Sequence, residues 1–340
     1  MKKTTMRLFP VLAVVGGVTY AVAKKVETDR SQAPEPREHT LRVQVSETSC
    51  GDNDISLAAL NAVLQMEAAQ AMPLLHKVLD RRDACSAELR QKAVFLVSQQ
   101  NTPEREEILL RVARDDRDME VRKQAVFWLS QVPGDEAVAG LESVLMQSNE
   151  QELRERAIFA LSQHPSDRAN AILRAYVQKA GEPDELRENA IFWLGNEGSA
   201  EDQAFLKELY SDLGSQQLKE KILFAVSQRS NEDSRNWLID VARNHSESVE
   251  MRKKAVFWLS QQGGFRADDL KGLYRSSPEL ELREQVLFAL SQRHEPDAVT
   301  ELIDIARNET NSDLREKAMF WLGQSGDPRA AEFLLEVIER

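Results

Sequence analysis

The residues that most often carry catalysis or hold metal ions are few and scattered in this sequence of 340 residues. The five histidines are His39, His76, His164, His245 and His294. No two of them are three or four residues apart, so no helix presents two imidazoles to one metal ion. Glycine-rich phosphate loops, nucleophile elbows and CxxC pairs do not occur in the sequence. We therefore predict no catalytic residue, no metal site and no cofactor.

The two cysteines, Cys50 and Cys85, are 35 residues apart. This separation is close to the repeat period described below, and equivalent points of stacked repeats are neighbours in space. In an oxidising compartment a disulfide is the expected state of such a pair, and two unpaired cysteines are the alternative. A disulfide here would stabilise the end of the array by roughly 3 to 4 kcal/mol in the chain-entropy model.

A phenylalanine returns every 31 to 33 residues through most of the chain. Self-similarity at a fixed period of this size is typical of repeat arrays, whose units bury their apolar faces only by stacking. The row consists of Phe95, Phe127, Phe159, Phe192, Phe224, Phe257, Phe288 and Phe320.

Each phenylalanine lies in a cassette of the form LRxxAxFxLSQ, whose apolar spacing predicts a helix. A cation stands five residues before the phenylalanine, and it is arginine in every copy except Lys219. We predict that this cation reaches a carboxylate in a turn and sets the stacking of the repeats. An amide stands four residues after the phenylalanine. The amides are Gln99, Gln131, Gln163, Asn196, Gln228, Gln261, Gln292 and Gln324.

The cassette resembles the second helix of short HEAT-like repeats of the phycobilin-lyase type, in which VRxxAxxALG precedes a Gly-Asp-Pro turn. The best match is LREKAMFWLGQSGDPRAAEFLLEVI, and the resemblance covers roughly residues 55 to 340. It implies an all-α fold, a right-handed superhelical α-solenoid of about nine two-helix repeats over residues 53–340. Such repeats serve mostly as binding scaffolds, so the resemblance says more about fold than about function.

Deoxyhypusine hydroxylases are HEAT-like di-iron enzymes that this chain also resembles. They place His-Glu pairs on several of these helices, three and four residues before the position of the phenylalanine. This chain has other residues there in every copy, for example Gln91-Lys92 and Lys253-Lys254. The resemblance therefore implies that the iron ligands and that activity are missing. Phycobilin lyases share the repeat, which leaves a lyase-like or chaperone-like role in ligand handling open.

Residues 1–23 have a basic start and an apolar run from Leu8 to Ala23. This run is shorter than the roughly 20 residues of a membrane span and is typical of a secretory signal peptide cleaved after Ala23. Lys24 and Lys25 at its exit leave an uncleaved membrane anchor as the alternative. We therefore expect an exported protein, periplasmic or extracellular. Residues 24–52 are polar, contain two prolines and predict a linker or irregular N-terminal arm.

The net charge of -12 and the lack of a basic stripe argue against nucleic acid as a partner. On a helical wheel the phenylalanine and the amide point away from the apolar side of the cassette. In the HEAT resemblance this outward face lines the concave surface. We predict that the eight phenylalanines and eight amides form a groove for a protein or peptide partner. The alternative is that each ring packs against the next repeat, as we expect for Trp128, Trp193, Trp258 and Trp321, which recur in every second copy.

Together these observations predict an exported, non-catalytic scaffold that binds a protein or peptide along the concave face. A ligand-handling HEAT protein and a mechanical spacer in an envelope complex are the alternatives.

Overall fold

The computed structural model describes residues 53–262, 266–293 and 295–339. These residues form eighteen α-helices and one short 3-10 helix, η1 (Ala84–Ser86), with no β-strand among them. The predicted signal peptide (residues 1–23), the predicted linker (residues 24–52) and Cys50 lie outside the described residues, so these predictions stay untested.

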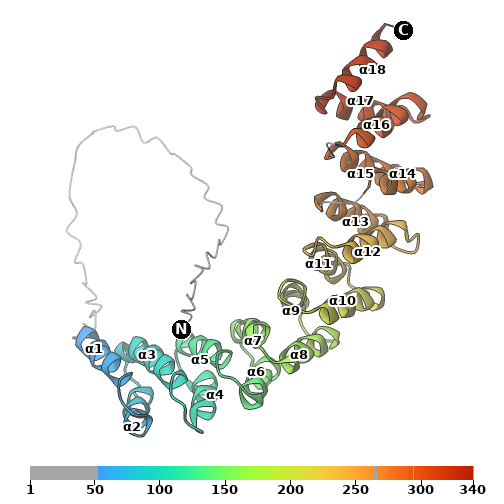
Figure 1. Cartoon of the computed structure of the whole chain (residues 1–340). Coiled ribbons are helices and arrows are strands. Elements are labelled where there is room, and N and C mark those ends of the chain that lie inside the picture. The colour runs from blue at the N-terminus through green and yellow to red at the C-terminus, as the bar shows by residue number, and fades with distance from the viewer. Residues whose placement is uncertain (1–52, 263–265, 294, 340) are drawn as a thin grey trace, which may run out of the picture. The chain divides into compact units, whose positions relative to one another are not determined.

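The helices alternate between two layers (Figure 1). One layer holds the odd-numbered helices, which carry the LRxxAxFxLSQ cassette from α3 onward. They are α1 (Asn53–Val63), α3 (Ala87–Ser98), α5 (Met119–Leu129), α7 (Gln151–Gln163), α9 (Asp184–Asn196), α11 (Gln216–Ser227), α13 (Val249–Gln261), α15 (Leu280–Ser291) and α17 (Ser312–Gln324).

The other layer holds the even-numbered helices, each of which follows its odd-numbered partner after a short connection. They are α2 (Ala68–Leu79), α4 (Arg105–Asp115), α6 (Asp135–Gln147), α8 (Asp167–Gln178), α10 (Ala200–Asp212), α12 (Glu232–Arg243), α14 (Ala267–Ser276), α16 (Pro296–Asn308) and α18 (Pro328–Ile338). Every odd-numbered helix packs against the next odd-numbered helix. The described helices thus form nine stacked pairs, which confirms the all-α solenoid.

The apolar core runs between the two layers. In α9 the positions six and two residues before the phenylalanine and two residues after it are Leu186, Ala190 and Leu194, and each is at most 1% exposed. The even-numbered helices contribute residues such as Leu173 and Leu206 from the other side. Because the core passes from one pair to the next, each repeat buries its apolar faces only by stacking on its neighbours.

Capping residues define where many helices begin. Asp118 accepts hydrogen bonds from the backbone N–H groups of Glu120 and Val121 at the start of α5. Ser199 and Asp202 form a reciprocal capping box at the start of α10. Because these side chains satisfy the free N–H groups of the first turn, each short loop can change chain direction at a fixed residue.

Helices α9 and α11 approach each other more closely than a side chain at Gly195 would allow. A Cβ atom built on Gly195 would lie 2.4 Å from the Cβ of Ala225 and 3.0 Å from its Cα. Six of the eight cassettes have serine at this position. In α9 the short distance to Ala225 leaves no room for a side chain, so packing requires glycine there. The equivalent residue of α17, Gly323, has open space around it.

We predict that Gly195→Ala destabilises the protein by about 1 to 3 kcal/mol because the added methyl overpacks the α9–α11 contact. Gly323→Ala is the matched control and should instead stabilise α17 by roughly 0.5 to 1 kcal/mol, since alanine favours a helix over glycine. Urea unfolding followed by circular dichroism measures both. Equal changes in stability for the two substitutions would show that helix propensity, and not the close approach of α9 to α11, determines the effect of Gly195→Ala.

Candidate functional site

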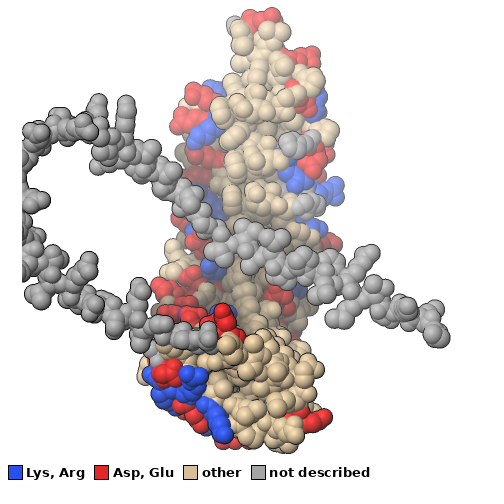
Figure 2. Space-filling model, turned by 90° about the vertical axis from the view of Figure 1, so that its left-hand side faces the viewer, with Lys and Arg blue, Asp and Glu red and all other residues tan. Residues whose placement is uncertain are grey.

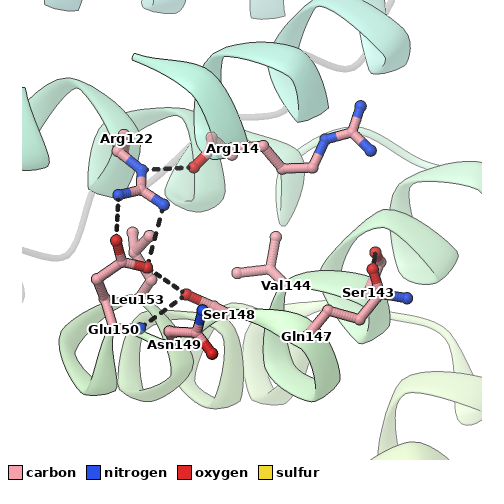
Figure 3. Close-up of a pocket in the computed structure, with 10 residues that line it drawn as sticks. Arg114, Arg122, Ser143, Val144, Gln147, Ser148, Asn149, Glu150 and Leu153 are labelled. Carbon is pink, nitrogen blue, oxygen red and sulfur yellow. Dashed lines mark hydrogen bonds and ion pairs between the residues drawn. The ribbon is translucent and has the colours of Figure 1, made fainter. Parts of the chain in front are cut away.

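In six of the eight cassettes the cation links its repeat to the next one, whereas Arg187 binds Asp184 at the start of its own helix, α9. In α5, the Nε of Arg122 donates to the carbonyl oxygen of Ala113 at 3.0 Å, and its terminal nitrogens donate to the carboxylate of Glu150 at 2.9 and 3.3 Å (Figure 3). Glu150 precedes α7, so the bond joins two repeats. Equivalent links are Arg90–Asp116, Arg154–Glu182, Lys219–Glu247, Arg252–Glu279 and Arg283–Glu309. The predicted structural role of this cation is confirmed.

The surface pocket beside this link has a volume of about 250 Å³ and is lined by residues such as Arg114, Val144 and Asn149 (Figure 3). Its charged wall is formed by Arg122 and Glu150, which bind each other. Ser148 also donates to Glu150 at 3.0 Å. Because Arg122, Glu150 and Ser148 bind one another, this wall of the pocket belongs to the stacking interface.

The same links lower carboxylate pKa values. The hydrogen bond from Arg122 lowers the pKa of Glu150 from 4.5 to about 2. The hydrogen bond from Lys179, followed by that from Arg154, lowers the pKa of Glu182 to about 2 despite partial burial. A carboxylate whose pKa is depressed on folding stabilises the protein above its unfolded pKa, and that stabilisation disappears as the pH falls.

We therefore predict that the protein loses stability as the pH falls from about 4.5 to about 2, the window between the unfolded and folded pKa values. Glu150→Gln and Glu182→Gln should be less stable than the wild type at pH 7 and should lose less stability across this window. Glu208→Gln, at an exposed carboxylate of α10, is the control. Thermal unfolding at a series of pH values tests this, and variants with the wild-type pH slope would contradict it.

The phenylalanine row lies on the surface of the odd-numbered helices. Six of the eight rings are partly exposed, while Phe257 is 36% and Phe320 is 59% exposed. The amides four residues later are all exposed as well. We call this surface of α3 to α17 the odd-helix face, and it contains all sixteen predicted partner-binding residues.

The rings of the row also contact the tryptophans, so packing and exposure coexist. Trp128 lies with its ring centroid 4.9 Å from that of Phe95 in the preceding repeat and 5.0 Å from that of Phe127 on its own helix. The same arrangement recurs at Trp193, Trp258 and Trp321. Each tryptophan thus holds two phenylalanines of neighbouring repeats in place, mostly edge to face, and leaves part of each ring open to solvent.

Alternation of tryptophan with smaller residues leaves hollows on this face. A pocket of about 480 Å³ is lined by Phe288 of α15 and by Phe320 and Trp321 of α17, together with charged residues. A second pocket, of about 240 Å³, is lined by Phe159 of α7 and charged neighbours. In both α7 and α15 the residue after the phenylalanine is alanine, namely Ala160 and Ala289.

The amides are held in one orientation by the serine that precedes them. In α13 the hydroxyl of Ser260 donates to the carbonyl oxygen of Phe257 at 2.6 Å, and Nε2 of Gln261 donates to that hydroxyl oxygen at 3.2 Å. A hydroxyl has one hydrogen, so a serine that donates to the carbonyl can only accept from the amide. The amide therefore turns its N–H toward the helix and its Oε1 toward solvent. The same arrangement occurs at Gln99, Gln131, Gln163, Gln228 and Gln292.

Our sequence reasoning did not anticipate this role of serine, although the recurring Ser-Gln pair was a visible signal. The two cassettes without it have glycine, at Gly195 and Gly323. There the amide of Asn196 donates to Glu197 instead.

A row of carboxylates completes the odd-helix face. Seven of the eight cassettes have an exposed acidic residue seven positions before the phenylalanine, close to two helical turns away on the same face. Lysines between the two rows pair with carboxylates of neighbouring helices, as Lys221 does with Glu188 at 3.3 Å. Figure 2 shows an uncharged band between margins where charged residues gather. The acidic residues are Glu88, Glu120, Glu152, Glu185, Glu250, Glu281 and Asp313.

The histidines, which the sequence offered as candidates for catalysis or metal binding, lie apart from this face or outside the described part of the chain. His164 is buried, and its ring nitrogens contact the carbonyl oxygen of Val132 at 3.1 Å and the backbone N–H of Ser166 at 3.2 Å. His39 and His294 are outside the described residues. Within residues 53–262, 266–293 and 295–339, no group of three His, Cys, Asp or Glu side chains is placed to hold a metal ion. The same residues contain no helix that is long and apolar enough to cross a membrane.

The stacked helical pairs define an α-solenoid of two-helix repeats. A family model described as HEAT repeats matches residues 72–161 and 267–340. The same cassette continues between the two matched stretches, and the chain contains HEAT repeats.

Two solved natural proteins are similar to the chain at low identity and with TM-scores below 0.5. Human deoxyhypusine hydroxylase is 21% identical with a TM-score of 0.33, and the match covers 71% of this chain and 90% of that one. The Escherichia coli protein YibA is 14% identical with a TM-score of 0.39, and the match covers 79% and 96% of the two chains. These likenesses concern the fold alone. No curated protein sequence matches the chain.

Proposed function

We propose that this protein is a non-catalytic scaffold that binds an extended segment of another protein along the odd-helix face. The observation that carries the proposal is the row of eight partly exposed phenylalanines, held by tryptophans and flanked by oriented amides. Exposed aromatic rings that are already fixed lose little entropy on binding, which favours a binding role.

The spacing of the row supports an extended ligand. Neighbouring packed helices lie about 8 to 10 Å apart, so eight phenylalanines span roughly 55 to 70 Å. An extended chain rises about 3.3 Å per residue, so about 17 to 21 residues would cover the row. A continuous row in which the same Phe and amide positions recur once per repeat suits a linear segment. A compact small molecule would instead require a concave, closed pocket.

The proposal includes the absence of catalysis. The support comes from the positions at which deoxyhypusine hydroxylases hold His-Glu pairs. In this chain these positions carry residues such as Lys123 and Lys253, which bind the carboxylates of Glu120 and Glu250. A cation at a metal-ligand position opposes the binding of an iron ion.

We predict that Phe257→Ser combined with Phe320→Ser weakens segment binding at least tenfold. These are the two most exposed rings, so the cost to folding should stay under about 2 kcal/mol, below the 3 to 5 kcal/mol of a buried phenylalanine. The measurement is selection of random 20-residue peptides by display on the purified wild type, followed by binding of the selected peptides to the variant.

Leu74→Ser combined with Leu335→Ser is the matched control, because these side chains are 40% and 55% exposed but lie on even-numbered helices. It should bind the selected peptides like the wild type. Selected peptides that bind the phenylalanine variant equally well, or a selection that yields none, would refute the proposed function.

We further propose that residues 1–23 direct export and are removed, and that Cys50 and Cys85 form a disulfide in the exported protein. The support is the basic and apolar pattern of the N-terminus and the one-repeat spacing of the cysteines. The exported protein should have the mass of a chain that begins at Lys24, and after denaturation without reductant it should react with no thiol reagent. A mass that includes Met1 would indicate an anchor, and two reactive thiols would exclude the disulfide.

A further inference from the structure

We propose that the segment bound on the odd-helix face is basic and carries arginine side chains along an extended backbone. This inference rests on the proposed function and adds the chemistry of the partner. Three properties of the face support this inference: the direction of its amides, the charge of its margin and the cation–π contacts of its aromatic rings.

The amide row offers acceptors. Because six serine hydroxyls are committed to phenylalanine carbonyls, the glutamines that follow them turn Oε1 to solvent, as Gln228 and Gln261 do. A partner that meets this row must therefore bring hydrogen-bond donors. Arginine carries five N–H donors and no acceptor, so its guanidinium matches a row of carbonyl oxygens better than any other side chain.

The margin of the face favours positive charge. From residue 53 onward the sequence has 50 Asp and Glu against 36 Lys and Arg. The lysines nearest to the aromatic row are engaged, as in the pairs of Lys254 with Glu220 and of Lys317 with Glu284. The exposed carboxylates seven residues before seven of the eight phenylalanines leave the margin acidic, and such a margin attracts a cationic segment and steers its approach.

Two of the aromatic rings already bind a cation from their own helix. The Nζ of Lys92 lies 5.0 Å from the ring centroid of Phe95, and the guanidinium carbon of Arg156 lies 5.9 Å from that of Phe159. Both cations come from the position three residues before the phenylalanine. In three other cassettes this position is an amide, so the rings receive no cation from it. These rings are Phe127, Phe192 and Phe288.

The pocket of about 480 Å³ at Phe288 shows how the three properties combine. Its aromatic wall is formed by Phe288 and Trp321, and its polar wall includes Glu281, an exposed carboxylate. Lys253, at the same pocket, binds Glu250 at 2.9 Å. An arginine side chain entering here would stack on the rings, within the roughly 6 Å over which cation–π attraction acts, and would reach Glu281.

The test uses fluorescently labelled 20-residue peptides that share a Ser-Ala background and have arginine, lysine, glutamine or glutamate at every third position. Binding to the full-length purified protein is measured by fluorescence anisotropy at 150 mM salt. We expect the arginine peptide to bind at least tenfold more tightly than the glutamine and glutamate peptides, and about threefold more tightly than the lysine peptide. Gln228→Met with Gln261→Met should weaken it several-fold, whereas Gln147→Met on the even-numbered α6 should not.

Each contrary result has a distinct meaning. Equal binding of the arginine and glutamine peptides, while display-selected peptides still depend on Phe257 and Phe320, would overturn this inference and leave the proposed function standing. If the arginine peptide binds the phenylalanine and glutamine variants as tightly as the wild type, its binding is general attraction to an acidic protein, and this result would also overturn the inference. Equal binding of the lysine and arginine peptides would overturn the choice of arginine. Loss of dependence on Phe257 and Phe320 for every peptide would remove the proposed function itself.

Discussion

A cation from one repeat bound to a carboxylate at the start of the next is the contact on which the stack depends. Arg90 and Asp116 are its most buried example, with side chains 1% and 3% exposed and N–O distances of 2.7 and 3.0 Å. Removing one member of such a pair leaves a buried charge and costs about 3 to 5 kcal/mol. More exposed links, such as Arg122–Glu150, are screened by solvent and contribute less to stability, and their role lies in fixing the register of neighbouring repeats.

This link and the apolar core occupy the inner side of each odd-numbered helix, so the outer side is only partly used for packing. The cation and the apolar residues of the cassette are used on the core side, so the phenylalanine, the amide and the acidic residue share the remaining surface. Repetition then turns three single positions into three parallel rows. A repeat protein thus obtains an extended surface from a short cassette, and the chemistry of that surface is decided by a few positions per repeat.

The tryptophans show how one residue can support both folding and a surface. Trp258 contacts Phe224 of the preceding repeat and Phe257 of its own helix at centroid distances of 5.1 and 5.0 Å. Rings held in this way keep their orientation while part of each stays open. The question of packing against exposure, which the sequence left undecided, therefore has no single answer: the rings pack on one side and face solvent on the other.

Local patterns in the sequence determined the period, the two helices of each repeat and the outward direction of Phe and Gln, because all three follow from the geometry of a single helix. Only the tertiary structure decided which carboxylate each cation binds, as the partner is Asp116 in one repeat and Glu150 in the next. It also decided the close approach of Gly195 to Ala225 and the tryptophan contacts between repeats. These contacts depend on how neighbouring helices cross and on the sizes of side chains about 30 residues apart, and no local pattern contains that information.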